Sequence, residues 1–327
     1  MTDTRRLVDG RDLAVAVRLA ILAPVAWAVP PRHWGAACAR LAAVFARAGK
    51  WPPRAAHLAA VLDGRDTGLD PAHWPRAHLA EAFRADVMLL RCQRPGAAAS
   101  PWTPPWRLDG GGHLDAALAA GTGAVLWVAP FVYSDLMAKM IPHLAGYRVH
   151  HLSRFSHGFS ETRAGMALLN PLRTRVEERF LASRQVIGTD GPVAALRALA
   201  RRLAGNGLVS FALGHRGRRV HAVPFLGGWM ELASGAADLA LRAGAPLLPV
   251  IVVREADGTL AATVGAPLDL DGAADRDGRG AAAAREFARR IEPAALAHPA
   301  QVAWHTYVRG PGAPPADAPV DGPGDRP

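Results

Sequence analysis

Residues 124–135 read Ala-Val-Leu-Trp-Val-Ala-Pro-Phe-Val-Tyr-Ser-Asp, and this stretch decides the fold class. Its first six residues are apolar and predict a short buried strand, which ends in a turn at Pro130. Asp135 opens the next segment, whose residues 136–141 read Leu-Met-Ala-Lys-Met-Ile and predict a helix. In open α/β sheets, ligands bind beyond the carboxyl ends of the parallel strands. The turn between this strand and this helix is therefore the first candidate for a functional site.

The alternation of strand and helix continues through the rest of the chain. Short segments, most of them largely apolar, predict further strands at residues 148–153, 186–188, 208–213, 220–225, 246–253 and 260–264. Helical spacing predicts helices at residues 113–120, 170–182, 231–243 and 281–296, and one ending near residue 204 with Thr189 or Asp190 as its N-cap. The pattern predicts an α/β fold in which helices flank a layered, largely parallel sheet.

Changes in composition divide the chain into three parts. Residues 1–96 are predicted to be a helical, membrane-associating region, and residues 97–309 an α/β domain. Residues 310–327 are rich in Pro, Gly and Asp without periodicity, which predicts a disordered tail. Residues 13–29 are strongly apolar, but Arg18 and Pro24 interrupt them, and the run is shorter than the ~20 residues of a membrane span. We expect a shallow interfacial anchor here; a helix packed into the protein's own core is the alternative.

Charge and cysteine content limit the possible partners. The formal net charge is +10 and the pI about 10.9, which suits an anionic membrane surface or an acidic carrier protein. No zinc-finger spacing or RNA-binding motif is present, so nucleic-acid binding is not expected. Cys38 and Cys92 have neither metal-ligand nor redox spacing, so no metal site is expected.

A second turn of interest, Gly214-His-Arg-Gly-Arg-Arg219, follows the predicted strand at residues 208–213. If both strands run parallel, the two turns face the same crevice. Several short motifs flank this turn along the chain. In order they are Gly121-Thr-Gly123 before the first strand, Asn170-Pro171, Val223-Pro-Phe-Leu-Gly227, Ser234-Gly-Ala-Ala-Asp-Leu-Ala240 and Gly244-Ala-Pro-Leu-Leu-Pro-Val250. Together with the turn at Asp135, this order resembles the bacterial lipid A lauroyl/myristoyl acyltransferases, of the lysophospholipid acyltransferase-like superfamily. The resemblance covers roughly residues 10–300.

The resemblance implies a glycerolipid acyltransferase-like fold and transfer of a fatty acyl chain. The donor would be an acyl thioester of acyl carrier protein or coenzyme A, used as co-substrate without any other cofactor. The acceptor would be a hydroxyl of a lipid or glycolipid such as a lipid A precursor. The expected location is the cytoplasmic face of the inner membrane, with the protein peripheral or shallowly anchored.

One position departs from the family's motif of a His, four residues and a carboxylate. Asp135 supplies the carboxylate, but Pro130 stands where the family has the His that acts as general base. Proline has no titratable side chain and cannot do this work.

Two hypotheses follow from this departure. In the first, His215 takes the role of base and Asp135 orients it, while Arg154, Arg216 and Arg218 bind a phosphate or the carrier's phosphopantetheine arm. In the second, the protein is a catalytically inactive member of the family that binds acyl chains or a partner enzyme. Phe131 and Tyr133 fit an apolar wall of the substrate pocket, which this second hypothesis retains. If His215 is not the base, His150 and His151 at the end of a strand are the next candidates, although surface exposure or local pairing is the commoner fate of such residues.

Overall fold

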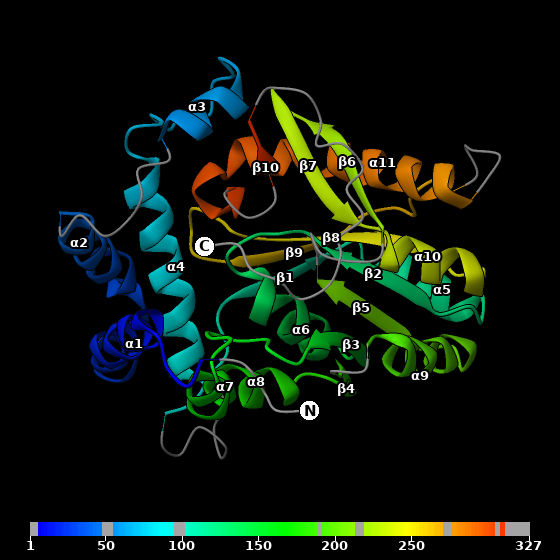
Figure 1. Cartoon of the computed structure of the whole chain (residues 1–327), viewed down its shortest axis with the longest axis horizontal. Helices are drawn as coiled ribbons and strands as arrows, with labels where there is room; N and C mark the ends of the chain where they lie inside the picture. The colour runs from blue at the N-terminus through cyan, green and yellow to red at the C-terminus, as the bar shows by residue number, and fades with distance from the viewer. Residues whose placement is uncertain are drawn as a thin grey trace.

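A computed structural model describes residues 6–47, 55–94, 102–188, 191–212, 219–270, 276–304 and 308–310 of the 327-residue chain. Figure 1 shows a central sheet with helices on both sides and a group of N-terminal helices beside it. The N-terminal helices are α1 (Gly10–Ala28), α2 (Trp34–Arg47), α3 (Ala55–Leu62) and α4 (Trp74–Arg91), with a 3-10 turn at Pro31–His33. The predicted α/β fold with an N-terminal helical region is confirmed.

The main sheet has seven strands in the order β1-β9-β8-β2-β5-β3-β4. Five adjacent strands run parallel to one another: β8 (Leu247–Arg254), β2 (Ala124–Val128), β5 (Leu208–Ala212), β3 (Val149–Arg154) and β4 (Ser183–Ile187). Strand β9 (Leu260–Val264) is antiparallel to β8, and β1 (Trp106–Asp109) is parallel to β9. Because β2, β5 and β3 are parallel neighbours, their carboxyl ends meet at one edge of the sheet.

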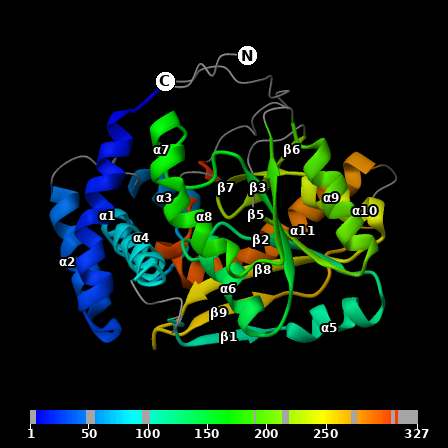
Figure 2. The same cartoon turned by 90° about the horizontal axis from the view of Figure 1, so that it is seen from below.

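Helices cover both faces of this sheet (Figures 1 and 2). Along β2, alternate residues face different cores, as the two-residue period of a strand requires. Val125 and Trp127 pack with the helices α9 (Val193–Ala204), α10 (Gly235–Ala243) and α11 (Arg276–Ala297). Leu126 packs on the other side with α4, α5 (Gly111–Ala119) and α6 (Ser134–Leu144). The remaining helices are α7 (Arg163–Leu168) and α8 (Asn170–Glu178), and a 3-10 turn at Pro299–Gln301 follows α11.

The structure corrects one predicted helix. Residues 231–233 do not begin a helix but belong to strand β7 (Gly228–Ala233), and α10 begins at Gly235. Strand β7 pairs antiparallel with β6 (Val220–Phe225) and with β10 (Val308–Arg309) in a separate three-stranded sheet. Alternate residues of β7 are buried, which is the period of a strand rather than of a helix. The sequence analysis also missed β1, whose residues lie next to a Pro- and Trp-rich connector.

Among the described residues, no helix has the length and apolar character needed to cross a membrane.

Two glycines before β2 are conformationally special, and they provide a matched pair for a stability test. Gly121 (φ +74°) and Gly123 (φ +59°) both adopt the left-handed conformation. A Cβ on Gly123 would lie 2.3 Å from the Gly207 carbonyl oxygen, whereas a Cβ on Gly121 would meet nothing within 4 Å.

We expect Gly121→Ala to lower the free energy of unfolding by about 1 kcal/mol, from backbone strain alone. Gly123→Ala should lower it by about 2–4 kcal/mol, because the overlap adds to the strain. Urea unfolding of both variants measures the difference, and equal losses would contradict it.

Candidate functional site

A pocket of about 210 Å³ lies beside the carboxyl ends of β2 and β5 and the middle of β3. The turn after β2 and the start of α6 form one side of it, and strands β3 and β5 supply the other side. Its lining residues are Val128, Ala129, Pro130, Phe131, Val132, Ser134, Asp135, Ala138, Lys139, His151, Ser210, Ala212 and Ala303. The lining from β2 and its turn is mostly apolar, whereas Asp135 and Lys139 of α6, His151 of β3 and Ser210 of β5 supply polar groups.

One side-chain and two backbone hydrogen bonds fix the turn that bears Pro130. The Ser134 hydroxyl donates to the Ala129 carbonyl at 2.7 Å, which ties the start of α6 to the end of β2. The amide of Ala303 donates to the Pro130 carbonyl at 2.9 Å, and the amide of Val132 donates to the Gln301 carbonyl at 2.7 Å. The segment of Gln301 and Ala303 therefore holds the turn in place through backbone hydrogen bonds. Pro130 itself contributes a carbonyl and a ring but no ionisable group.

An arginine from α8 engages Asp135. The Arg173 guanidinium forms a hydrogen bond and an ion pair with the Asp135 carboxylate, whose side chain is 48% exposed. Arg173 also lies 3.7 Å from Asp86 of α4, which in turn lies 3.2 Å from Arg18 of α1. The Phe159 ring packs against the guanidinium, 4.6 Å from its central carbon. Asp135 thus forms one end of a chain of charges that runs back to the N-terminal helices.

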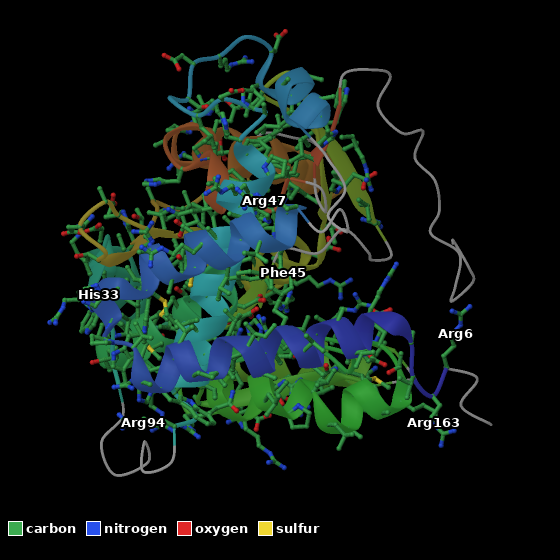
Figure 3. All side chains as sticks on the ribbon, turned by 90° about the vertical axis from the view of Figure 1, so that its left-hand side faces the viewer. Arg6, His33, Phe45, Arg47, Arg94 and Arg163 are labelled. Carbon is green, nitrogen blue, oxygen red and sulfur yellow. The ribbon has the colours of Figure 1, made fainter. Side chains whose placement is uncertain are left out.

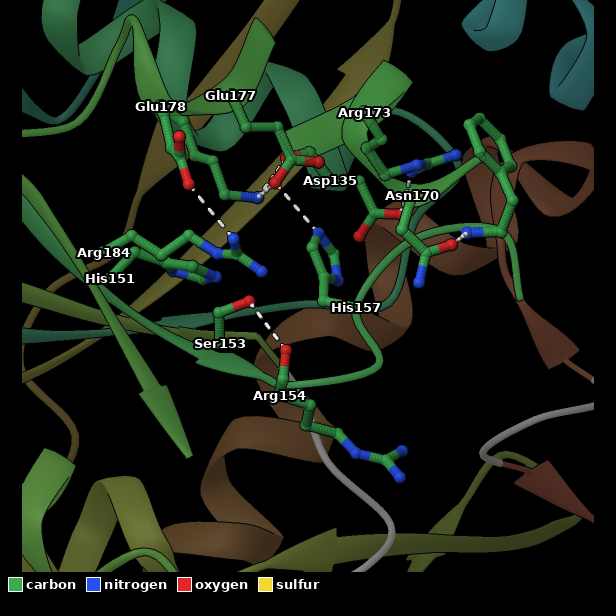
Figure 4. A network of polar contacts seen from close by, with 12 residues as sticks. Asp135, His151, Ser153, Arg154, His157, Asn170, Arg173, Glu177, Glu178 and Arg184 are labelled. Atoms are coloured by element: carbon green, nitrogen blue, oxygen red, sulfur yellow. Dashed lines mark hydrogen bonds and ion pairs between the residues drawn. The ribbon is translucent and has the colours of Figure 1, made fainter. Parts of the chain in front are cut away.

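A buried ion pair lies deeper, between α6 and α8. The Lys139 Nζ is 3.0 Å from the Glu177 carboxylate, and the two side chains are 4% and 1% exposed. The Lys139 ammonium also donates to the Asp135 carbonyl, and His157 Nε2 lies 2.9 Å from Glu177 (Figure 4). Burial alone would raise the pKa of Glu177, but the charge of Lys139 and the hydrogen bond from His157 outweigh it and lower that pKa. Glu177 is therefore ionised at neutral pH.

A histidine and a serine face each other across β3 and β5. His151 is directly opposite Ser210 in the register of the two strands, and its Nδ1 lies 2.8 Å from the Ser210 hydroxyl. Both side chains are buried, and both residues line the pocket. Burial, with a contribution from Lys139, lowers the pKa of His151 well below its ordinary value. The imidazole is therefore neutral at pH 7 and keeps a basic nitrogen.

The structure brings some of the predicted site residues together and separates others. Asp135 and Phe131 line the pocket. Tyr133 is buried outside its lining, and its hydroxyl donates to Glu81. Arg154 lies at the end of β3 with a 54% exposed side chain, 3.5 Å from Glu161. His215, Arg216 and Arg218 lie outside the described residues, so the pairing of His215 with Asp135 stays a prediction.

The sequence analysis missed Lys139, Glu177, Arg173 and Ser210. Lys139 alone gave a signal, because it is a lysine in an otherwise apolar helix and one of only two lysines in the chain. The other three acquire their roles only when α8 and β5 are placed against α6 and β3.

The sequence comparison agrees with this arrangement. Residues 99–306 match the model of the family described as bacterial lipid A biosynthesis acyltransferase, which covers well over half of the chain. Comparison with individual curated proteins gives no match. The matched region contains every strand of the main sheet and all the residues that line the pocket.

The buried ion pair gives a stability prediction. Lys139→Met should lower the free energy of unfolding by about 3–5 kcal/mol, because it leaves the buried Glu177 carboxylate without its ammonium partner. Arg289→Met is the control: its partner Glu286 lies on the surface of α11, and the loss should stay below about 1 kcal/mol.

The same pair predicts how stability depends on pH. Because the folded-state pKa of Glu177 is lowered, its contribution is fully present above the unfolded value of about 4.3 and is lost as the pH falls below it. Urea unfolding at pH 7 and pH 3.5 tests both statements. A wild-type advantage over Lys139→Met that stays the same at pH 3.5 would contradict the second.

Proposed function

Since the chain belongs to the bacterial lipid A biosynthesis acyltransferase family, we propose that it is an acyltransferase. It transfers a fatty acyl chain from an acyl thioester to a hydroxyl of a lipid or glycolipid. The thioester would be carried by acyl carrier protein or coenzyme A, and a lipid A precursor is the natural acceptor class for this family. In the reaction, the acceptor oxygen attacks the thioester carbonyl carbon and the carbon–sulfur bond breaks. The acceptor proton leaves with the thiol.

The observation that carries the proposal is the position of the pocket. It opens beside the turn of residues 130–135, at the carboxyl ends of parallel strands, where ligands of α/β sheets bind. A volume of about 210 Å³ suits the reacting end of the substrates, while a long acyl chain or a carrier would extend beyond it. The apolar lining from β2 suits the first methylenes of an acyl chain, and the polar groups from α6, β3 and β5 suit a hydroxyl and a thioester carbonyl.

A second candidate function follows from Pro130 and the pairing of Asp135. A proline at the family's base position, together with a carboxylate engaged by Arg173, fits a protein that binds acyl chains or a partner enzyme without turnover. A single measurement distinguishes the two functions: labelled lipid product forms only if the protein is a transferase.

The test uses the full chain, purified in detergent, with labelled acyl carrier protein and acyl coenzyme A thioesters and a membrane lipid extract. We expect label to move from the thioester to lipid. Ala138→Leu should abolish this transfer, because Ala138 is buried in the pocket lining and the larger side chain fills the pocket. The matched control, Ala194→Leu on the exposed face of α9, should leave transfer unchanged. Acyl retention without transfer by the wild type would favour the second function, and full activity of Ala138→Leu would exclude this pocket as the site.

We also propose that α1 places the protein on the membrane, at the cytoplasmic face of the inner membrane. Leu13, Val17 and Ile21 recur every fourth residue, so they share one face of α1, and they are 67%, 47% and 39% exposed. The exposed Arg6 and Arg163 lie near the amino end of this helix (Figure 3). An exposed apolar stripe flanked by cations suits an anionic lipid surface.

Sedimentation with vesicles of phosphatidylglycerol and phosphatidylethanolamine tests the membrane proposal. The triple variant Leu13→Ser, Val17→Ser, Ile21→Ser should lose most of the binding seen for the wild type. Val193→Ser, on an exposed position of α9, is the control and should bind as the wild type does. Equal binding by the triple variant would show that another surface carries the contact.

A further inference from the structure

Strand β3 carries two adjacent histidines, and each forms a pair with a serine. His151 Nδ1 lies 2.8 Å from the hydroxyl of Ser210 on β5, and His150 Nδ1 lies 2.7 Å from the hydroxyl of Ser183 on β4. Because side chains alternate along a strand, the two histidines point to opposite faces of the sheet. Only the pair of His151 and Ser210 borders the pocket. The molecule thus contains two chemically similar pairs, one at the site and one away from it.

The hydrogen-bonding pattern of His151 leaves one ring nitrogen for a substrate. Nδ1 is held by Ser210, and within the described part of the chain Nε2 has no hydrogen-bond partner. With Nδ1–H donating to the serine oxygen, Nε2 carries the lone pair. The strand fixes the ring, because His151 is only 3% exposed and its backbone lies in register between Ser210 and Arg184. A basic nitrogen in a fixed orientation beside the pocket is what general-base catalysis requires.

Several charged groups surround this imidazole. Lys139 of α6, His157 in the loop after β3 and Arg184 of β4 disfavour its protonation, and Glu177 of α8 favours it. Burial is the largest influence, and with the three cationic or imidazole neighbours it outweighs Glu177 and lowers the pKa of His151 well below its ordinary value. The neutral form therefore persists into mildly acidic solution, where an ordinary imidazole, with a pKa of about 6.5, would be charged.

We propose that His151 is the general base of the acyl transfer and that Ser210 is its positioning residue. The inference rests on the proposed transferase function and names the group that replaces the missing side chain at Pro130. Nε2 of His151 takes the proton of the acceptor hydroxyl as its oxygen bonds to the thioester carbonyl carbon. The carbon–sulfur bond then breaks, and the imidazolium returns that proton to the leaving thiolate. Ser210 accepts a hydrogen bond from Nδ1–H throughout, which holds the ring in the required tautomer.

The test measures transfer by the full chain in detergent at saturating thioester, over pH 4.5–8.5, for matched variants. His151→Gln keeps the size and polarity of the side chain but removes the base, so we expect kcat to fall by about 10²–10⁴-fold with a thioester KM close to that of the wild type. His150→Gln and Ser183→Ala alter the second pair in the same way and should leave kcat within a few-fold. Thermal unfolding of each variant shows whether it is folded.

The dependence of kcat on pH distinguishes a role in catalysis from a purely structural role of His151 and Ser210, because a structural role would leave the acidic limb of the profile unchanged. For the wild type, the acidic limb of kcat should lie clearly below pH 6.5, because the base stays neutral there. Ser210→Ala should lower kcat and displace this limb, since the hydroxyl that orients the ring is gone. If His151→Gln does not fold, the Ser210→Ala profile decides, and an unchanged limb overturns the proposal.

Other outcomes also overturn it. Transfer that survives His151→Gln, or an acidic limb near pH 6.5 that is lost only in His215→Ala, would assign the base to another residue while leaving the proposed function intact. An acyl group trapped on Ser210 would make the serine a nucleophile and contradict direct transfer. No transfer by the wild type would instead remove the transferase function itself, and this inference with it.

Discussion

The ion pair between Lys139 and Glu177 is the interaction on which the site depends. It joins α6 to α8 at a depth where both side chains are almost completely buried. Taking two such charges out of water costs several kcal/mol per ion, so the pair is retained only because each charge compensates the other and both make further hydrogen bonds. Lys139 donates to the Asp135 carbonyl, and Glu177 binds His157. The relative position of the two helices in turn brings Arg173 to Asp135. One buried pair of opposite charges therefore positions the polar groups of α6 that line the pocket.

The strands that place the pocket were predictable because their signal is local. Residues 124–129 are a continuous apolar run, and residues 208–213 are apolar except for Ser210, as parallel strands covered on both faces should be. The antiparallel sheet of β6, β7 and β10 was harder to predict. Its middle strand is six residues long and is followed directly by a helix, so a pattern based on local spacing assigns Glu231 to that helix. What makes these residues a strand is pairing with β6 and β10, including the 2.8 Å ion pair between Arg309 and Glu231, and that pairing is not encoded locally.

The turn that borders the pocket was predictable from the sequence, but the residues that contact it were not. The strand-end turn and Asp135 could be found from sequence because a glycine-led strand, a turn and an acidic helix start are adjacent in the chain. The partner of Asp135 is an arginine 38 residues further on, and no spacing rule connects them. His151 and Ser210 are separated by 59 residues and face each other only because β3 and β5 pair in one particular register. A shift of one residue would turn either side chain to the opposite face of the sheet.

In the proposed mechanism, the strand order explains how the acceptor hydroxyl could meet a base other than a side chain at residue 130. In the strand order β2-β5-β3, a side chain on β3 is two strand spacings from β2, or roughly 10 Å. That is far enough that His151 cannot occupy the position of a base at residue 130, yet near enough that both residues border one pocket. An acceptor hydroxyl would then meet its base from the side of β3 instead of β2. In this mechanism Asp135 has no imidazole to orient, and its ion pair with Arg173 has a structural role. The pair anchors the start of α6 to α8. Through Asp86, Arg173 also links α6 to the helices that we expect to lie on the membrane.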